Sequence, residues 1–295
     1  MKTITIISGK GGTGKTILAA SLGAVLDHSI LIDADVNAPN LSLFIKNKPE
    51  KEFEIKTGNS FAVIDNTCVL CGICVEICRF NAITRKTKSE KPEIDPNLCI
   101  GCAVCSYKCP AESIFLTERP GSRVILGKTD QGYILYPDSD LNEGVSGKLI
   151  SELRNIAENS VWSKECNYIV IDGSPGTGCH VIAALTDSDI PIIVTEPTKA
   201  AKGDLIRIAD LLEHFKLKGF VVINKADLNR KITDEIKEYS KQKCLEVLGN
   251  IPMFEGFFEI INSGNLPINT GSNEVRESFS EVVRRIQEKL KKEEE

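Results

Sequence analysis

The residues with the clearest chemical potential form a glycine-rich stretch near the start of the chain, Ser8 to Thr16. It fits the phosphate-binding pattern G-x-x-x-x-G-K-[ST], which begins at Gly9 and closes with Lys15 and Thr16. Glycines let successive backbone N–H groups curl around phosphate oxygens. We expect Lys15 to reach the outer phosphates and the Thr16 hydroxyl to ligate Mg²⁺. The predicted phosphate contacts are Gly9, Lys10, Gly11, Gly12, Thr13, Gly14, Lys15 and Thr16.

A second chemically active group consists of eight of the eleven cysteines, which fall between Cys68 and Cys109. They form two runs of C-x2-C-x2-C-x3-C, and Cys68 and Cys99, which begin the runs, lie thirty-one residues apart, so the segment is an internal repeat. Clustered cysteines without an export signal bind metal more often than they form disulfides. Two zinc sites are one alternative, but three cysteines in such a tight run fit an iron–sulfur cubane better than tetrahedral zinc.

This double run resembles the bacterial two-cluster ferredoxins, in which each run gives three ligands to one 4Fe–4S cluster and its fourth cysteine to the other. The resemblance assigns one cluster to Cys68, Cys71, Cys74 and Cys109, and the second to Cys78, Cys99, Cys102 and Cys105. Pro110 completes the second run, whereas Arg79 stands where the first run would carry proline. That departure puts the solvent access and potential of the nearby cluster in question, but it leaves all eight thiols in place.

Acidic residues end two strand-like runs that are predicted to lie beside the phosphate loop. Asp33 and Asp35 close the run 29–35, and Asp172 closes the run 167–172. An acid at the carboxyl end of such a strand is placed to contact Mg²⁺ or its water shell. We therefore predict that Thr16, Asp33 and Asp172 surround Mg²⁺, with plain solvated strand-end acids as the alternative.

Lys10 adds a second lysine to the loop, giving G-K-G-G-x-G-K-T. This resembles the deviant Walker A motif of the MinD/Mrp/ParA ATPases and the nitrogenase iron protein, whose early lysine crosses a dimer interface to the partner's nucleotide. The resemblance implies that Lys10 and Lys15 are catalytic and that the chain forms an ATP-dependent homodimer or a heterodimer with a paralogue. A solvated loop lysine is the alternative for Lys10.

The acidic segments carry the same resemblance. Asp33-Ala34-Asp35 is similar to the family's D-x-D segment, whose second acid positions the attacking water, so the resemblance makes Asp35 the catalytic acid. The segment from Asp172 to Gly178 resembles the D-x-P-P-G-T-G stretch of Mrp-type proteins. We expect it to act as a switch that senses the γ-phosphate.

Contacts to the base are predicted from two later segments. Asn224 to Asp227 reads N-K-x-D, the guanine signature of GTPases, but in the MinD-like group the same asparagine reads adenine. Gly249 to Pro252 resembles that family's late loop covering the base. Since the Lys10 signature goes with ATP enzymes, we predict ATP, held through Asn224, Asp227 and Pro252, with GTP as the alternative.

The elements that must position these residues alternate between strand and helix. Strands are predicted at 3–7, 29–35, 123–126, 133–136, 167–172, 190–194 and 220–223, and the main helices at 17–26, 146–159, 204–214, 232–243 and 275–291. Such alternation predicts an α/β P-loop fold with a mostly parallel sheet and helices on both faces. Residues 58–118 interrupt it as an inserted α+β ferredoxin-like domain, so the ATPase domain consists of 1–57 and 119–295.

Composition narrows the class of protein further. The chain is 42% hydrophobic and 26% charged, and its net charge of −5 argues against general nucleic-acid binding. It has no run of eighteen apolar residues and opens with a strand, which predicts a cytoplasmic protein. The last helix has one apolar face from Val275 to Leu290 but ends in acids. The C-terminal helix by which MinD anchors in a membrane is basic, so we expect this helix to pack on the sheet instead.

Two classes of function fit these motifs. The first is a slow, partner-stimulated ATPase in which nucleotide-driven dimer rearrangement is coupled to electron transfer through two 4Fe–4S clusters to a partner enzyme. The alternatives are an Mrp-like factor that assembles or delivers iron–sulfur clusters, and a redox-sensing regulatory ATPase. Clusters with all four ligands in place are suited to carrying electrons and hard to give away, which favours the first.

Cys179 is the remaining cysteine of interest. It lies seven residues after Asp172, where the nitrogenase iron protein has a cluster-ligating cysteine. That cluster needs a second cysteine from an earlier loop, and the chain has none between Glu118 and Cys166. We therefore predict a buried thiol in the switch.

Overall fold

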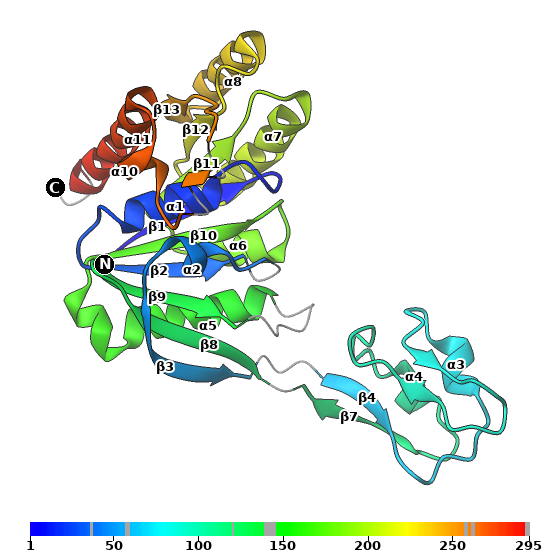
Figure 1. The fold of residues 1–295 in the computed structure, drawn as a ribbon. Helices are drawn as coiled ribbons and strands as arrows, with labels where there is room; N and C mark the ends of the chain where they lie inside the picture. The colour runs from blue at the N-terminus through cyan, green and yellow to red at the C-terminus, as the bar shows by residue number, and fades with distance from the viewer. Residues whose placement is uncertain are drawn as a thin grey trace. The chain divides into compact units, whose positions relative to one another are not determined.

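The computed structural model describes residues 1–35, 38–56, 60–119, 121–138, 146–256, 259–260 and 263–292. The chain divides into two compact units (Figure 1). We call Met1–Phe53, Val124–Ser139 and Ser146–Glu295 the sheet unit, and Glu54–Arg123 the cysteine-rich unit. Each of them has its own core.

A nine-stranded sheet forms the centre of the sheet unit, in the order β13-β12-β11-β1-β10-β2-β9-β8-β3. The strands are β1 (Lys2–Ser8), β2 (Ser29–Ala34), β3 (Lys48–Ile55), β8 (Ser122–Lys128), β9 (Gly132–Pro137), β10 (Tyr168–Pro175), β11 (Ile190–Thr195), β12 (Phe220–Asn224) and β13 (Glu246–Ile251). Strands β13 to β9 pair in parallel, and β8 runs antiparallel to β9. Parallel strands bring their carboxyl ends to one edge, which gathers the predicted acids there.

Helices cover both faces of the sheet (Figure 1), as the strand–helix alternation predicts. They are α1 (Lys15–Gly23), α2 (Leu41–Phe44), α5 (Ser146–Asn159), α6 (Cys179–Leu185), α7 (Lys199–His214), α8 (Arg230–Gln242), α10 (Pro267–Thr270) and α11 (Asn273–Lys292), with a 3₁₀ turn at Val161–Glu165. α1 and α11 pack on one face around Ile4 and Ile6, and α6, α7 and α8 on the other around Ile7.

The packing of α11 is as predicted. Its apolar residues, Val275, Phe279, Val282, Val283, Ile286 and Leu290, are all buried against the sheet. Within the described part of the chain, no helix is long and apolar enough to cross a membrane.

Two sheet-edge strands differ from the sequence prediction. No strand was predicted between residues 35 and 123 in the sheet, yet Lys48–Ile55 form β3, an edge strand of the sheet. Its mostly exposed, charged side chains hide the strand pattern and suit an unpaired edge. Gly249 to Ile251 lie in β13 rather than in a loop, and Gly249 packs against Val282 of α11.

The cysteine-rich unit contains two small antiparallel sheets and two short helices. β4 (Ser60–Ile64) pairs with β7 (Ile114–Glu118), β5 (Ile83–Thr84) pairs with β6 (Glu93–Ile94), and the helices are α3 (Ile73–Ile77) and α4 (Val104–Tyr107). Each half of the repeat therefore pairs its first strand with the last strand of the other half. This crossing brings the end of each cysteine run beside the other run.

The backbone repeats more closely than the sequence does. Left-handed residues recur thirty-one positions apart in both halves, at Leu70 and Gly101, Gly72 and Ala103, and Asn81 and Glu112. This conformation is uncommon outside glycine and is maintained here in a non-glycine residue of each pair. The two cysteine loops thus share one turn geometry.

Candidate nucleotide site and cysteine pockets

The phosphate loop connects β1 to α1 and is shaped by its glycines. Gly12 and Gly14 have φ values of 76° and 98°. A Cβ at Gly14 would lie 2.4 Å from the Asn224 side-chain amide, so any larger residue there would collide with it. At the start of the loop, the Ser8 hydroxyl donates to the Lys10 carbonyl oxygen at 2.7 Å. The loop is therefore constrained at both ends.

The end of β12 braces this loop. Asn224 Nδ2 donates to the Thr13 carbonyl at 2.8 Å, and Lys225 Nζ donates to the Gly12 carbonyl at 3.2 Å. Asp227 Oδ1 accepts from Met253 N at 2.6 Å, which ties the segment after β13, including Pro252, to the same region. The structure thus gives Asn224 a role in supporting the phosphate loop; its contact with a base stays a prediction.

The two predicted metal acids lie side by side. Asp33 and Asp172 are register partners in the parallel pair β2 and β10. Asp33 accepts from Asp35 N at 3.1 Å and from Leu41 N at 2.9 Å. Both carboxylate oxygens of Asp172 are buried and accept no hydrogen bond from any described residue. A buried carboxylate without a partner is costly and demands an explanation.

Burial controls the titration of these acids. It raises the pKa of Asp172 to about 7, although the positive charge of Lys15 and the nearby Thr16 hydroxyl, which does not meet hydrogen-bond geometry with the carboxylate, act in the opposite direction. Burial, followed by the charge of Asp172, raises the pKa of Asp33 well above its ordinary value. Burial also raises the pKa of Asp35, against the nearby charge of Lys15. The cluster of acids beside Thr16 fits a hard divalent cation, which prefers oxygen ligands.

The segment after Asp172 is tied to both neighbouring elements. Gly176 N donates to the Ser8 carbonyl at 2.8 Å, and the Ser174 hydroxyl donates to the Ala34 carbonyl at 2.7 Å. A displacement of the phosphate loop or of β2 would therefore also displace this segment. Cys179 begins α6 and is exposed, so the prediction of a buried thiol was wrong. The reason is that the first turn of a short helix at a strand end faces solvent.

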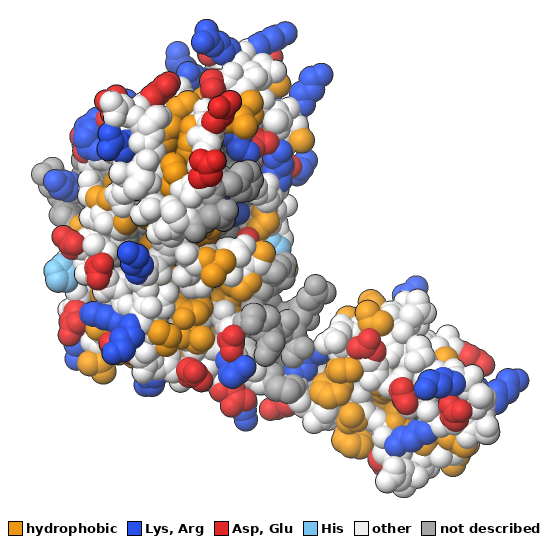
Figure 2. Space-filling view, viewed as in Figure 1, with side chains coloured by type: hydrophobic (Ala, Val, Ile, Leu, Met, Phe, Trp, Pro, Cys, Tyr) orange, Lys and Arg blue, Asp and Glu red, His pale blue; other side chains and the backbone are white. Residues whose placement is uncertain are grey.

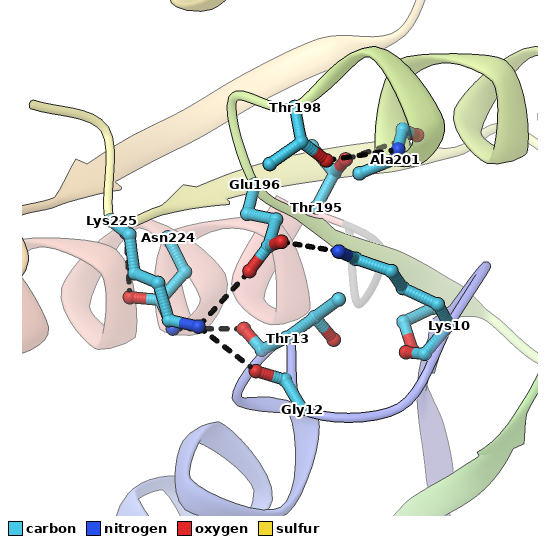
Figure 3. A network of polar contacts seen from close by, with 10 residues as sticks. Lys10, Gly12, Thr13, Thr195, Glu196, Thr198, Ala201, Asn224 and Lys225 are labelled. Carbon is cyan, nitrogen blue, oxygen red and sulfur yellow. Dashed lines mark hydrogen bonds and ion pairs between the residues drawn. The ribbon is translucent and has the colours of Figure 1, made fainter. Parts of the chain in front are cut away.

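An ion-pair network that the sequence analysis did not single out lies beside the loop (Figure 3). Glu196, directly after β11, forms ion pairs with Lys10 and, at 3.0 Å, with Lys225. Burial raises the pKa of Glu196, but the two lysines outweigh it and the pKa lies below its usual range. The signal that identified Asp172, an acid at a strand's carboxyl end, applies equally to Glu196.

In the cysteine-rich unit, the eight clustered cysteines line two separate hollows. One, of about 10 Å³, is lined by Cys68, Cys71, Cys74 and Cys109; the other, of about 70 Å³, is lined by Cys78, Cys99, Cys102 and Cys105. Each hollow takes three thiols from one run and the last thiol from the other. Among the described residues, no three His, Cys, Asp or Glu side chains are placed as ligands of a single metal ion.

Hydrogen bonds and apolar side chains surround these thiols. Ala62 N donates to Cys99 Sγ at 3.4 Å, and the Ser113 hydroxyl lies 3.3 Å from Cys109 Sγ. Burial raises the pKa of the Cys74 and Cys105 thiols. Exposed apolar side chains also line the two hollows: Val69, Ile73, Phe80, Ile100 and Val104. Figure 2 shows apolar side chains gathered on the surface of this unit.

The sequence of the chain is similar to those of known proteins. The model of the CobQ/CobB/MinD/ParA nucleotide binding domain matches residues 4–268. An uncharacterised protein of Methanocaldococcus jannaschii is 31% identical over 233 residues, 77% of this chain and 79% of its own length. The iron–sulfur cluster carrier protein of that organism is 23% identical over 310 residues, 97% of this chain and 84% of its own.

Solved structures show the same fold. The septum site-determining protein MinD from Pyrococcus horikoshii, in complex with Mg-ADP, has a TM-score of 0.56 at 18% identity, over 97% of this chain and 95% of its own. At this identity, the likeness concerns the fold alone.

Because the Asp172 carboxylate is buried without a hydrogen bond, we predict that replacing it stabilises the nucleotide-free protein. Because the pKa of Asp172 in the folded chain is about 7, above the usual 3.8, the free energy of unfolding falls as the pH rises between those values. Asp172→Asn has no carboxyl group at this position, so its free energy of unfolding does not fall in this way. Without nucleotide or Mg²⁺, its melting temperature should exceed that of the wild type by on the order of 5 °C at pH 8, and by less toward pH 4.

Thermal melts across this pH range measure the effect. Asp130→Asn, at an exposed turn position, is the matched control and should change little at any pH. A destabilisation of Asp172→Asn that is the same at every pH would contradict the assignment.

Proposed function

Because the chain belongs to the CobQ/CobB/MinD/ParA nucleotide-binding family, we propose that it is an ATPase whose nucleotide cycle drives electron transfer through two 4Fe–4S clusters. The observation that carries the proposal is the division of eight cysteines into two hollows of four, in a chain with a complete phosphate loop. The clusters, ATP and Mg²⁺ are all part of the proposal.

In the nucleotide site, Lys15 and the loop N–H groups bind the phosphates. Thr16, Asp33 and Asp172 would hold Mg²⁺, which neutralises charge on the β- and γ-phosphates. The buried, unbonded oxygens of Asp172 support this, because a cation would offset the cost of burying them. Asp35 orients the water that attacks the γ-phosphorus, and the bond to the β–γ bridging oxygen breaks.

Lys10 acts across the interface of an ATP-dependent dimer in this proposal. Its side chain is partly exposed on the loop, where a second protomer could meet it. Asn224 and Asp227 remain the proposed contacts for adenine, with Pro252 nearby. Guanine is the alternative base, since the residues match the N-K-x-D pattern.

In the cysteine-rich unit, the residues fit a cubane better than zinc. Four thiolates around one zinc ion at about 2.3 Å stand roughly 3.8 Å from one another, whereas the four ligands of a cubane each bind a different iron and stand further apart. Two separate hollows, each lined by four thiols, supply one complete ligand set for each proposed cluster. The crossed strand pairing explains why each set draws its last cysteine from the other run.

We propose electron transfer rather than cluster delivery because of the number of ligands that each cluster would have. Each cluster would have all four ligands within one chain, so it would exchange electrons more readily than be given away. The exposed apolar side chains around the hollows suit docking of a redox partner protein. Similarity to an iron–sulfur cluster carrier protein favours the second candidate, a delivery ATPase.

Metal analysis tests the cluster assignment. Protein prepared without oxygen should contain about eight irons and eight sulfides per chain. Cys71→Ser should lose the signal of one cluster and retain nucleotide binding, because the cysteine-rich unit has its own core. Cys244→Ser, at an exposed cysteine of the sheet unit, should keep both clusters. Stoichiometric zinc without iron–sulfur absorbance would exclude the redox function.

Paired lysine variants test the ATPase assignment. Lys15→Ala should lose nucleotide affinity by at least tenfold, because the phosphates lose their main counter-ion. Lys10→Ala should bind nucleotide but lose ATP-dependent dimerisation and most hydrolysis. Nucleotide binding by fluorescence titration and dimerisation by sedimentation velocity distinguish the two. Normal dimerisation and hydrolysis by Lys10→Ala would show that Lys10 is only a solvated loop lysine.

A further inference from the structure

Glu196 holds the lysine that the proposed dimer needs. Its carboxylate forms an ion pair with Lys10 through Oε1 and another with Lys225 through Oε2 (Figure 3). We propose that Glu196 retains Lys10 within its own protomer, and that this ion pair must break before two ATP-bound chains can associate. The inference rests on the proposed role of Lys10 at the dimer interface, and it makes Glu196 a positioning residue rather than a catalytic one.

The acceptor side of this ion pair is fixed by the turn between β11 and α7. The Thr195 hydroxyl donates to the Ala201 carbonyl at 3.4 Å, and Thr198 caps α7 by accepting from Ala201 N at 3.2 Å. The Glu196 side chain is 9% exposed, whereas that of Lys10 is 37% exposed. When the pair breaks, Lys10 is therefore the partner that moves.

Lys225 lowers the free-energy cost of releasing Lys10. Leaving a buried carboxylate without a partner would cost several kcal/mol, which would lock the pair. Here Lys225 stays 3.0 Å from Glu196 Oε2 and continues to neutralise it. The same ammonium group also donates to the Gly12 carbonyl, so the phosphate loop keeps its brace when Lys10 leaves. One carboxylate shared by two lysines can release one of them.

The expected size of the effect follows from the exposure of the pair. A partly exposed ion pair changes an equilibrium by up to about fivefold. A symmetric dimer must break two such pairs, one in each protomer. Removing the Glu196 charge should therefore tighten ATP-dependent dimerisation by up to about 25-fold.

The test is a double-mutant cycle on the full chain. Glu196→Gln keeps the shape of the side chain and removes its charge. With Mg²⁺ and a non-hydrolysable ATP analogue, its dimer dissociation constant by sedimentation velocity should be lower than that of the wild type, by up to about 25-fold. Lys10→Ala alone should not dimerise, and adding Glu196→Gln should not restore dimerisation, because the lysine to be released is absent.

Two further variants keep the result interpretable. Glu235→Gln breaks the ion pair of Glu235 with Lys202 between α8 and α7, which involves neither Lys10 nor Lys225, and should dimerise like the wild type. Glu196→Asp keeps a charge beside Lys225 but shortens the reach toward Lys10, and should give a smaller gain in the same direction. It also provides the test if Glu196→Gln folds poorly in thermal melts.

Two results would overturn the inference: unchanged or weaker dimerisation of folded Glu196→Gln or Glu196→Asp, or dimerisation restored to Lys10→Ala by Glu196→Gln. Failure of the proposed function looks different. In that case Lys10→Ala alone would dimerise like the wild type, whatever the Glu196 variants do. A defective Lys10→Ala together with an unresponsive Glu196→Gln contradicts only the retention of Lys10 by Glu196.

Discussion

Two carboxylates buried side by side at the ends of β2 and β10 are the constraint on which the rest of the nucleotide site depends. Asp33 is held by backbone N–H groups, but the oxygens of Asp172 accept no hydrogen bond from the described residues. The parallel sheet imposes this proximity, because register pairs the two residues directly. The folded chain therefore carries a cost that Lys15 offsets only in part and that a bound cation would offset further. In the proposed function, Mg²⁺ bound at Asp172 would restore the stability that its burial costs.

Asp33 lies on the part of the chain that leads into the cysteine-rich unit. Asp33 accepts from the backbone N–H of Leu41, the first residue of α2, and β3 begins only four residues after α2 ends. Asn47, in that short connection, donates to the Ser42 and Ile45 carbonyls and accepts from the Tyr136 hydroxyl of β9. A shift of Asp33 toward a metal ion would thus pull on a short, bonded segment that leads into β3. The proposed coupling between nucleotide and clusters would use that segment.

Much of the site could be predicted from sequence, because its motifs are local. The phosphate loop and the two cysteine runs are defined by spacing, and the rule that acids at strand ends gather at one edge identified Asp33 and Asp172. That rule was not applied to Glu196, whose importance comes from Lys10 and Lys225, residues far from it in sequence. The support that Asn224 gives to Thr13 is likewise tertiary and invisible in the N-K-x-D pattern. β3 escaped prediction as a strand because an exposed edge carries charges instead of alternating apolar residues.

The central claim is that nucleotide and clusters communicate within one chain, and a redox titration tests it most directly. Nucleotide can shift a cluster only if its affinity differs between the two oxidation states, and that linkage is reciprocal. For a coupling of about 1–3 kcal/mol, the one-electron midpoint potential should move by roughly 45–130 mV on adding a non-hydrolysable ATP analogue with Mg²⁺. The shift should be absent in Lys15→Ala. Titration curves that coincide with and without nucleotide would contradict coupling within the protein and favour the cluster-delivery function.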